Sequence, residues 1–150
     1  MKIIKLAMLL LLAIGVGESS AQIYNPVTWS YAAKRTSSTE AVVFIKAVID
    51  QGWHIYSIKQ PDGGPLKTTL TLSKSPQYQT LGNPTEPKPM KLFEKVFDMD
   101  VLYFEKQVIF QQKVKLLAAN AKINGKVGFM ACNDKRCLNP QEIEFSLIVK

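Results

Sequence analysis

Hydrophobic and polar residues alternate with a period of two along most of this chain, as in β-strands that bury one face. The run Val27–Tyr31 places its apolar residues at every second position. Val108–Leu116 does the same, with Gln112 as the one polar interruption of its apolar face. Ile143–Val149 alternates in the same way. Each of these segments predicts a strand that is half buried.

Three further segments favour strands with somewhat different surroundings. Residues Ala41–Ile49 are apolar on both faces except at Lys46, which predicts a central strand covered on both sides. Leu66–Leu72 carries leucine or threonine at every second position, which predicts one buried face. The alternation in Val127–Ala131 continues directly into Cys132.

Proline and glycine separate these segments. Gln51–Gly52 ends one strand, and Trp53–Ile58 begins the next. Pro61–Gly64 predicts a turn, because proline fixes φ and glycine permits a positive φ. Four prolines and few apolar residues predict an irregular surface loop over residues 75–89. About seven to nine short strands without an amphipathic helix predict an all-β fold, an antiparallel β-sandwich.

The N-terminus has the charged, apolar and small-residue order of a secretory signal peptide. Lys2 and Lys5 precede an apolar run at Leu6–Val16, and the expected signal peptide spans residues 1–21. The run has about half of the ~20 residues that a membrane-spanning helix needs. We therefore expect export of a single domain, residues 22–150, without a membrane anchor.

Charge and composition argue against several kinds of partner. The chain has a formal net charge of +7, but its lysines are scattered, which favours a solvated surface over a nucleic-acid patch. One histidine and two cysteines do not make a zinc site, and no metal or cofactor is expected. A copper site using the thiols with Met90, Met99 and Met130 is an alternative, since soft sulfur suits Cu(I), but these methionines follow no repeating spacing.

Cys132 and Cys137 are the main candidate chemistry, and in an oxidising compartment we expect them to pair. A ring this small stabilises a fold by roughly 2 kcal/mol, against about 4–5 kcal/mol for a bridge across most of a domain. The loop between them is polar, and Lys135 and Arg136 would favour the thiolate of Cys137. The residues alone leave both a structural and a reactive disulfide open.

The run Phe129–Pro140 resembles the active-site segment of the N-terminal periplasmic domains of the DsbD thiol:disulfide interchange proteins. Gly52–Ser57 resembles the glycine-aromatic strand start of that family. Lys95–Val108 resembles its cap region and the following strand. The resemblance extends from about Val42 to Val149, but only the cysteine segment is specific. Larger members continue into a transmembrane electron carrier, whereas this chain is expected to be a stand-alone module.

The resemblance implies an immunoglobulin-like β-sandwich in the periplasm. It implies a protein-disulfide reductase component that receives electrons from a membrane-embedded thiol carrier of the DsbD or CcdA type. The acceptors would be thioredoxin-like proteins, disulfide isomerases or cytochrome c maturation thiols. Cys137 would form the mixed disulfide and Cys132 would resolve it. The alternative is an immunoglobulin-like binding module in which the disulfide is passive.

The resemblance also suggests residues that support the cysteines. An aromatic side chain shields the cysteines in the family, and Phe97 or Phe93 is the candidate here, although both are equally compatible with ordinary core anchors. His54 and Tyr56 share strand parity near the expected site. His54 could accept a proton or be a plain strand residue. Asp134 lies between the cysteines in sequence, and its effect on them depends on geometry.

Overall fold

The structure is a computed structural model that describes residues 24–150, so the signal peptide expected over residues 1–21 lies outside the described residues. The described chain is built from strands and contains no helix, and therefore no helix that could cross a membrane. The expected all-β fold is confirmed. The strands are β1 (Val27–Arg35), β2 (Glu40–Ile49), β3 (His54–Tyr56), β4 (Thr69–Leu72), β5 (Tyr78–Thr85), β6 (Met90–Glu94), β7 (Met99–Phe104), β8 (Gln107–Leu116), β9 (Ala121–Phe129), β10 (Ala131–Cys132) and β11 (Gln141–Val149).

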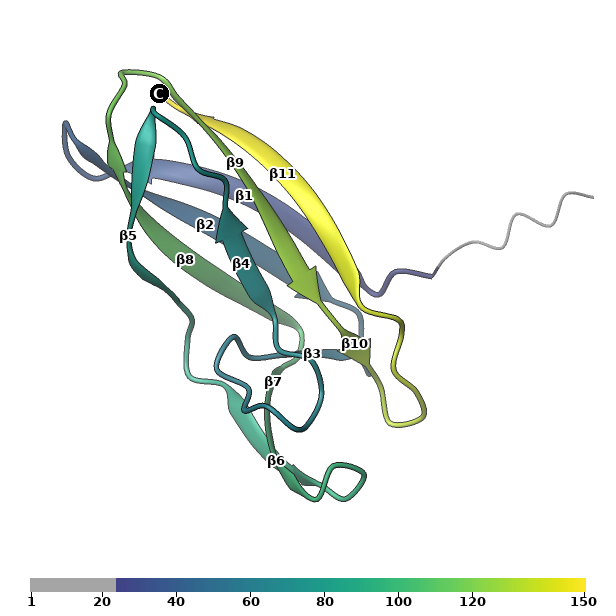
Figure 1. Cartoon of the computed structure of the whole chain (residues 1–150). Helices are drawn as coiled ribbons and strands as arrows, with labels where there is room; N and C mark the ends of the chain where they lie inside the picture. The colour runs from purple at the N-terminus through teal and green to yellow at the C-terminus, as the bar shows by residue number, and fades with distance from the viewer. Residues whose placement is uncertain (1–23) are drawn as a thin grey trace, which may run out of the picture.

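Two antiparallel sheets form an immunoglobulin-like sandwich (Figure 1). One sheet has the order β1-β2-β8-β5 and the other has the order β11-β9-β4. Their facing residues are the alternate apolar positions that the sequence pattern predicts. The core includes Val43, Ile45, Phe110, Val114, Ile123, Val127 and Phe145. Burial of these side chains from both sheets is what holds the sheets together.

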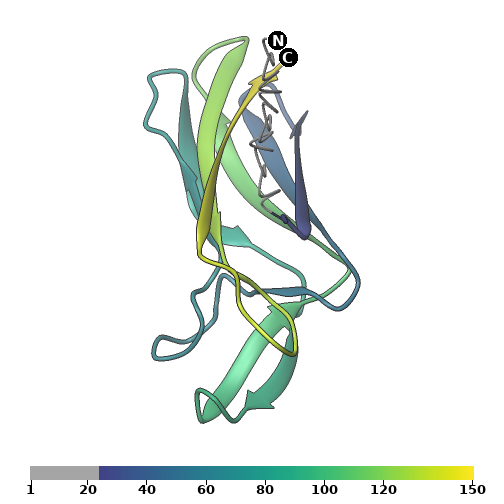
Figure 2. The same ribbon diagram turned by 90° about the vertical axis from the view of Figure 1, so that its right-hand side faces the viewer.

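A third, smaller sheet extends the sandwich at one end, with the order β10-β3-β7-β6. Both views place the β6–β7 hairpin and the loop that follows β10 at this same end (Figures 1 and 2). The cysteine loop and the expected cap region are separated by about thirty residues in sequence, but the small sheet brings them together. This end of the molecule therefore holds the candidate site.

The prediction that β2 is covered on both sides is wrong. Its inner residues are buried, but on the other face Phe44 is only partly covered and Val48 is 43% exposed. No second layer packs on that face within the described chain. The outer positions of β2 are apolar too, so the sequence pattern did not distinguish a covered face from an open one.

The irregular loop expected over residues 75–89 is wrong in part, because β5 occupies its middle. The buried ring of Tyr78 anchors β5, and its hydroxyl donates hydrogen bonds to the carbonyl oxygens of Ser73 and Asn124. Pairing with β8 shifts register between Leu81 and Thr85. Gly82 and Pro84 therefore lie at an irregularity in an edge strand, where a missing N–H donor is tolerated.

Two smaller details also differ from the sequence pattern. β4 begins at Thr69, and Leu66 is 54% exposed in the preceding loop. Gln112, the polar interruption of β8, is buried, and its amide nitrogen donates to the carbonyl oxygens of Lys113 and Leu81. A buried amide is tolerated because these hydrogen bonds replace those it would make with water.

Candidate active site around the cysteine hairpin

Cys132 and Cys137 form a disulfide across a short β-hairpin, with their Cα atoms 4.0 Å apart. The two residues face each other as an antiparallel pair. On the strand side of this pair, the Leu138 N–H donates to the Ala131 carbonyl at 2.9 Å. On the tip side, the Asn133 N–H donates to the Arg136 carbonyl at 2.9 Å. Backbone hydrogen bonds thus flank the disulfide on both sides.

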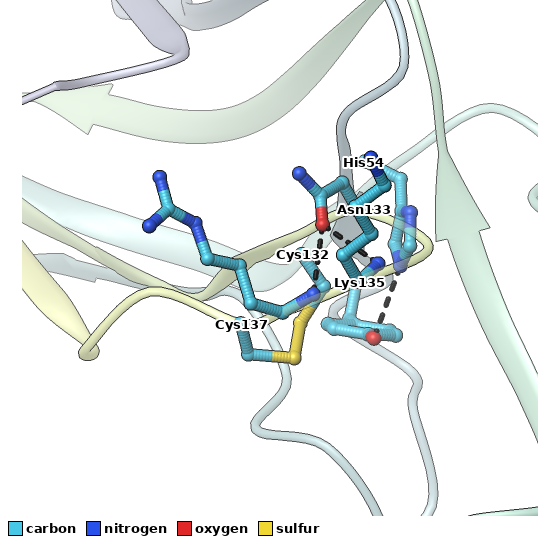
Figure 3. Close-up of a disulfide and its surroundings, with 7 residues drawn as sticks. His54, Cys132, Asn133, Lys135 and Cys137 are labelled. Carbon is cyan, nitrogen blue, oxygen red and sulfur yellow. Dashed lines mark hydrogen bonds between the residues drawn. A yellow bond between two sulfur atoms is a disulfide. The ribbon is translucent and has the colours of Figure 1, made fainter.

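The side chain of Asn133 organises the tip of this hairpin (Figure 3). Its Oδ1 atom accepts hydrogen bonds from the backbone N–H groups of Lys135 at 2.9 Å and Arg136 at 2.8 Å. Asparagine forms such bonds to the backbone two or three residues ahead in its own turn. The tip is therefore closed by a side chain as well as by the main chain.

The two cysteines differ sharply in exposure. Cys132 is 1% exposed and belongs to a small cluster with Tyr56 and Val101. Cys137 lies on the exposed part of the loop. An incoming sulfur atom can therefore approach Cys137 directly, whereas Cys132 is covered by the small sheet. Lys135 and Arg136 are also exposed, next to Cys137.

His54 is the cross-strand partner of Cys132, because β10 pairs with β3. Its Nε2 atom lies 3.1 Å from the Tyr56 hydroxyl in a hydrogen bond whose donor depends on the imidazole tautomer. Burial lowers the pKa of His54 from its usual value, and the charges of Glu94 and Glu105 oppose that shift. Burial, helped by Glu94, raises the pKa of Tyr56. At neutral pH both side chains are therefore uncharged.

The two cap candidates lie in different places on the β6–β7 hairpin. Phe97 is partly buried and packs against the cluster that contains Cys132. Phe93 is 54% exposed on β6, opposite Asp100. The hairpin turn is closed by the Phe97 N–H, which donates to the Glu94 carbonyl at 3.2 Å. The structure thus places Phe97, and not Phe93, against the cluster that contains Cys132.

A groove of about 370 Å³ lies beside the cysteine hairpin. It is lined by the start of the loop, including Asp134, and by residues of β6. Its lining includes His54, Leu92, Glu94, Tyr103, Glu105 and Asp134. Among the described residues, none of these three carboxylates takes part in an ion pair.

Sequence reasoning named the cysteines and several of their neighbours but did not single out Asn133, Tyr103 or the residues of β6 and β7 that line the groove. The polarity of the loop does not by itself mark Asn133, but an asparagine directly after a strand is a recognisable turn signal. Tyr103 was not singled out, although its ring centroid lies 5.3 Å from that of His54. Its proximity follows from pairing between β3 and β7, which the sequence pattern does not specify.

Within residues 24–150, no group of three or more histidine, cysteine or acidic side chains is arranged to hold a metal ion. Met99 and Met130 both pack against the cluster around Cys132. Met90 is 41% exposed on β6, the edge strand of the small sheet, and is not among the residues that pack against this cluster.

Comparison with known proteins gave a match to one family, described as the N-terminal domain of the thiol:disulfide interchange protein DsbD, over residues 25–148. A comparison with curated proteins gave no significant match.

Solved structures share the fold at low sequence identity. The N-terminal periplasmic domain of ScsB from Proteus mirabilis superposes with a TM-score of 0.59 at 16% identity. That alignment covers 84% of this chain but only 47% of the ScsB domain, so this chain spans about half of its length. The reduced DsbD N-terminal domain of Neisseria meningitidis gives a TM-score of 0.50 at 13% identity, with 78% of this chain and 82% of that chain covered.

A second Neisseria meningitidis structure holds the DsbD N-terminal domain in a complex with the PilB N-terminal domain. It superposes with a TM-score of 0.55 at 13% identity, covering 83% of this chain and 87% of that one. At identities this low, these structures are evidence for the fold of the chain alone.

Proposed function

The chain belongs to the family of N-terminal domains of the thiol:disulfide interchange protein DsbD, and we propose on that premise that it relays electrons in the periplasm through Cys132 and Cys137. The reduced pair would pass two electrons to a disulfide in another protein. A membrane-embedded thiol carrier would then reduce the pair again. The observation that carries this proposal is the disulfide itself, with one exposed and one buried sulfur at an accessible end of the sandwich.

The chemistry consists of two exchange steps. The Cys137 thiolate attacks one sulfur of the partner's disulfide, a mixed disulfide forms, and the partner's other sulfur leaves as a thiolate. Cys132 then loses its proton and attacks the Cys137 sulfur. The partner's second sulfur leaves, so the partner gains two electrons and Cys132 and Cys137 are again a disulfide. The exposure of Cys137 supports its role in the first step.

His54 is our candidate acceptor for the proton that Cys132 loses in the second step. It is the cross-strand neighbour of Cys132, and its lowered pKa leaves the imidazole neutral and free to accept. Its hydrogen bond with Tyr56 orients the ring. Lys135 and Arg136 supply positive charge near Cys137, which favours the attacking thiolate.

Phe97 is our candidate cap, because it packs on the cluster around Cys132 from the end of the β6–β7 hairpin. A partner would displace this hairpin and occupy the groove between β6 and the cysteine loop. Partners of this kind include thioredoxin-like proteins and disulfide isomerases. The complex of a DsbD N-terminal domain with a PilB N-terminal domain supports docking of another protein domain on this fold.

Single-cysteine variants test the order of attack. Cys132→Ser leaves Cys137 free, and we expect this variant to trap a mixed disulfide with a peptide that carries an activated disulfide. Cys137→Ser leaves only the buried Cys132, and we expect its reaction to be at least tenfold slower because access limits exchange. Mass spectrometry of non-reduced samples measures the adducts.

The matched control is the same reaction with each variant unfolded in denaturant. Both cysteines should then react at similar rates, since burial no longer separates them. Equal rates in the folded variants, or faster trapping through Cys132, would contradict the assignment of Cys137 as the attacking residue.

A further inference from the structure

The tip of the cysteine hairpin closes without the backbone geometry that short hairpins normally use. Two-residue hairpin turns favour types I′ and II′, which need a positive φ at a central position. Asp134 and Lys135 are the central residues, and neither is among the residues with positive φ. The Arg136 N–H accordingly donates to Asn133 Oδ1, at 2.8 Å, in place of the main-chain carbonyl of a regular hairpin.

Three hydrogen bonds centred on Asn133 therefore hold the tip, and none of them involves sulfur. Two are accepted by the side-chain oxygen, from Lys135 and Arg136, and the third is donated by the Asn133 N–H to the Arg136 carbonyl. On the other side of the cysteines, the hydrogen bond from Leu138 to Ala131 closes the hairpin stem. Breaking the disulfide removes none of these bonds.

We propose that Asn133 is a positioning residue for disulfide exchange, whose side chain keeps the hairpin closed after the disulfide is reduced. Cys132 and Cys137 then remain opposite each other, and the second exchange step starts from an aligned pair. This inference rests on the proposed function, because the position of the reduced cysteines matters only if the pair changes redox state.

Loss of the Asn133 side chain changes the redox equilibrium, because it affects the order of the reduced loop more than that of the oxidised loop. Without the Asn133 side chain, the reduced loop relaxes into many conformations, whereas the oxidised loop must still close around the disulfide. Closing a disordered loop costs entropy, so the variant disulfide forms less readily. Loss of Asn133 therefore makes the pair easier to reduce.

The experiment measures the equilibrium between the protein and glutathione for the wild type and Asn133→Ala. One protein dithiol and one glutathione disulfide give one protein disulfide and two glutathione thiols, so electrons and protons balance. Two lost hydrogen bonds of about 1 kcal/mol each set an upper limit near thirtyfold. We expect the equilibrium constant to fall roughly tenfold, which raises the reduction potential by about 30 mV.

Two variants control for charge and for the acceptor atom. Asn133→Asp keeps an oxygen that accepts both N–H bonds but adds one negative charge, and Lys135→Gln changes the net charge by the same amount. We expect the equilibrium constants of these two variants to agree within about twofold. The aspartate oxygen still accepts both hydrogen bonds, so the change in net charge, which is the same in both variants, is the only effect that remains. Resolution of a mixed disulfide at Cys137 should slow in Asn133→Ala alone.

The possible failures are distinguishable. An Asn133→Ala variant that loses thermal stability equally in both redox states, with an unchanged equilibrium constant, would show a purely structural role and overturn the inference. The proposed function would survive that result. Failure of the wild-type pair to exchange with glutathione or with any activated peptide would instead contradict the proposed function itself.

Discussion

His54 links the electrostatics of the site to the stability of the fold. It pairs across the strands with the buried Cys132 and hydrogen-bonds with the Tyr56 hydroxyl, and burial disfavours its charged form. The unfolded chain binds a proton at this histidine near pH 6.5, while the folded chain binds it only at lower pH. The unfolded state therefore holds more protons in that window, and the folded protein is less stable as pH falls.

We predict that the free energy of unfolding declines as pH falls below about 6.5, until His54 is also protonated in the folded state. His54→Asn should remove this slope, because His54 is the sole histidine of the chain. Urea unfolding at a series of pH values between about 5 and 8 measures it. A slope of equal size in the variant would assign the effect to another group.

At the scale of elements, two hairpins lie together at one end of the sandwich, and each contributes a different part of the candidate site. The hairpin around β10 carries the disulfide, and the β6–β7 hairpin brings Phe97 onto the cluster that contains Cys132. The β6–β7 turn uses Asp98 at φ 52°, a left-handed conformation that aspartate tolerates better than most residues. The turn places Phe97 against this cluster while Phe93 stays exposed.

We predict that Phe97→Ala lets a small thiol reduce the disulfide about fivefold faster, because exchange depends on access to sulfur. Phe93→Ala is the matched control, since it removes the same side chain from an exposed position of the same hairpin. Stopped-flow reduction by dithiothreitol measures both rates. Equal acceleration in the two variants would mean that Phe97 does not shield the disulfide.

For the molecule as a whole, alternation predicted the sandwich well because each core strand buries one face. β1, β8 and β11 lie where the pattern placed them, whereas β9 already begins at Ala121 and ends at Phe129. The pattern could not show that β2 lacks a covering layer, because an apolar residue looks the same whether or not another layer packs on it. It also missed β5, where local proline and glycine signals oppose pairing that the neighbouring strand imposes.

The candidate site was predictable in part. The cysteine pair and its polar loop are local in sequence, so they could be named directly. The neighbours of Cys132 come from β3 and β7 through strand pairing, and only the family resemblance suggested some of them. The positions of Tyr103, Glu94 and Glu105 beside the cysteine loop depend on strand pairing in the small sheet. The choice between Phe93 and Phe97 likewise required the orientation of a hairpin.

The reduction potential of the Cys132–Cys137 pair tests the central claim most directly. The purified protein is equilibrated in thiol redox buffers, and free thiols are trapped with a mass tag. Thiol exchange proteins have potentials of roughly −270 to −120 mV, and we predict a value in this range. A potential below about −300 mV would identify a structural disulfide and contradict the relay.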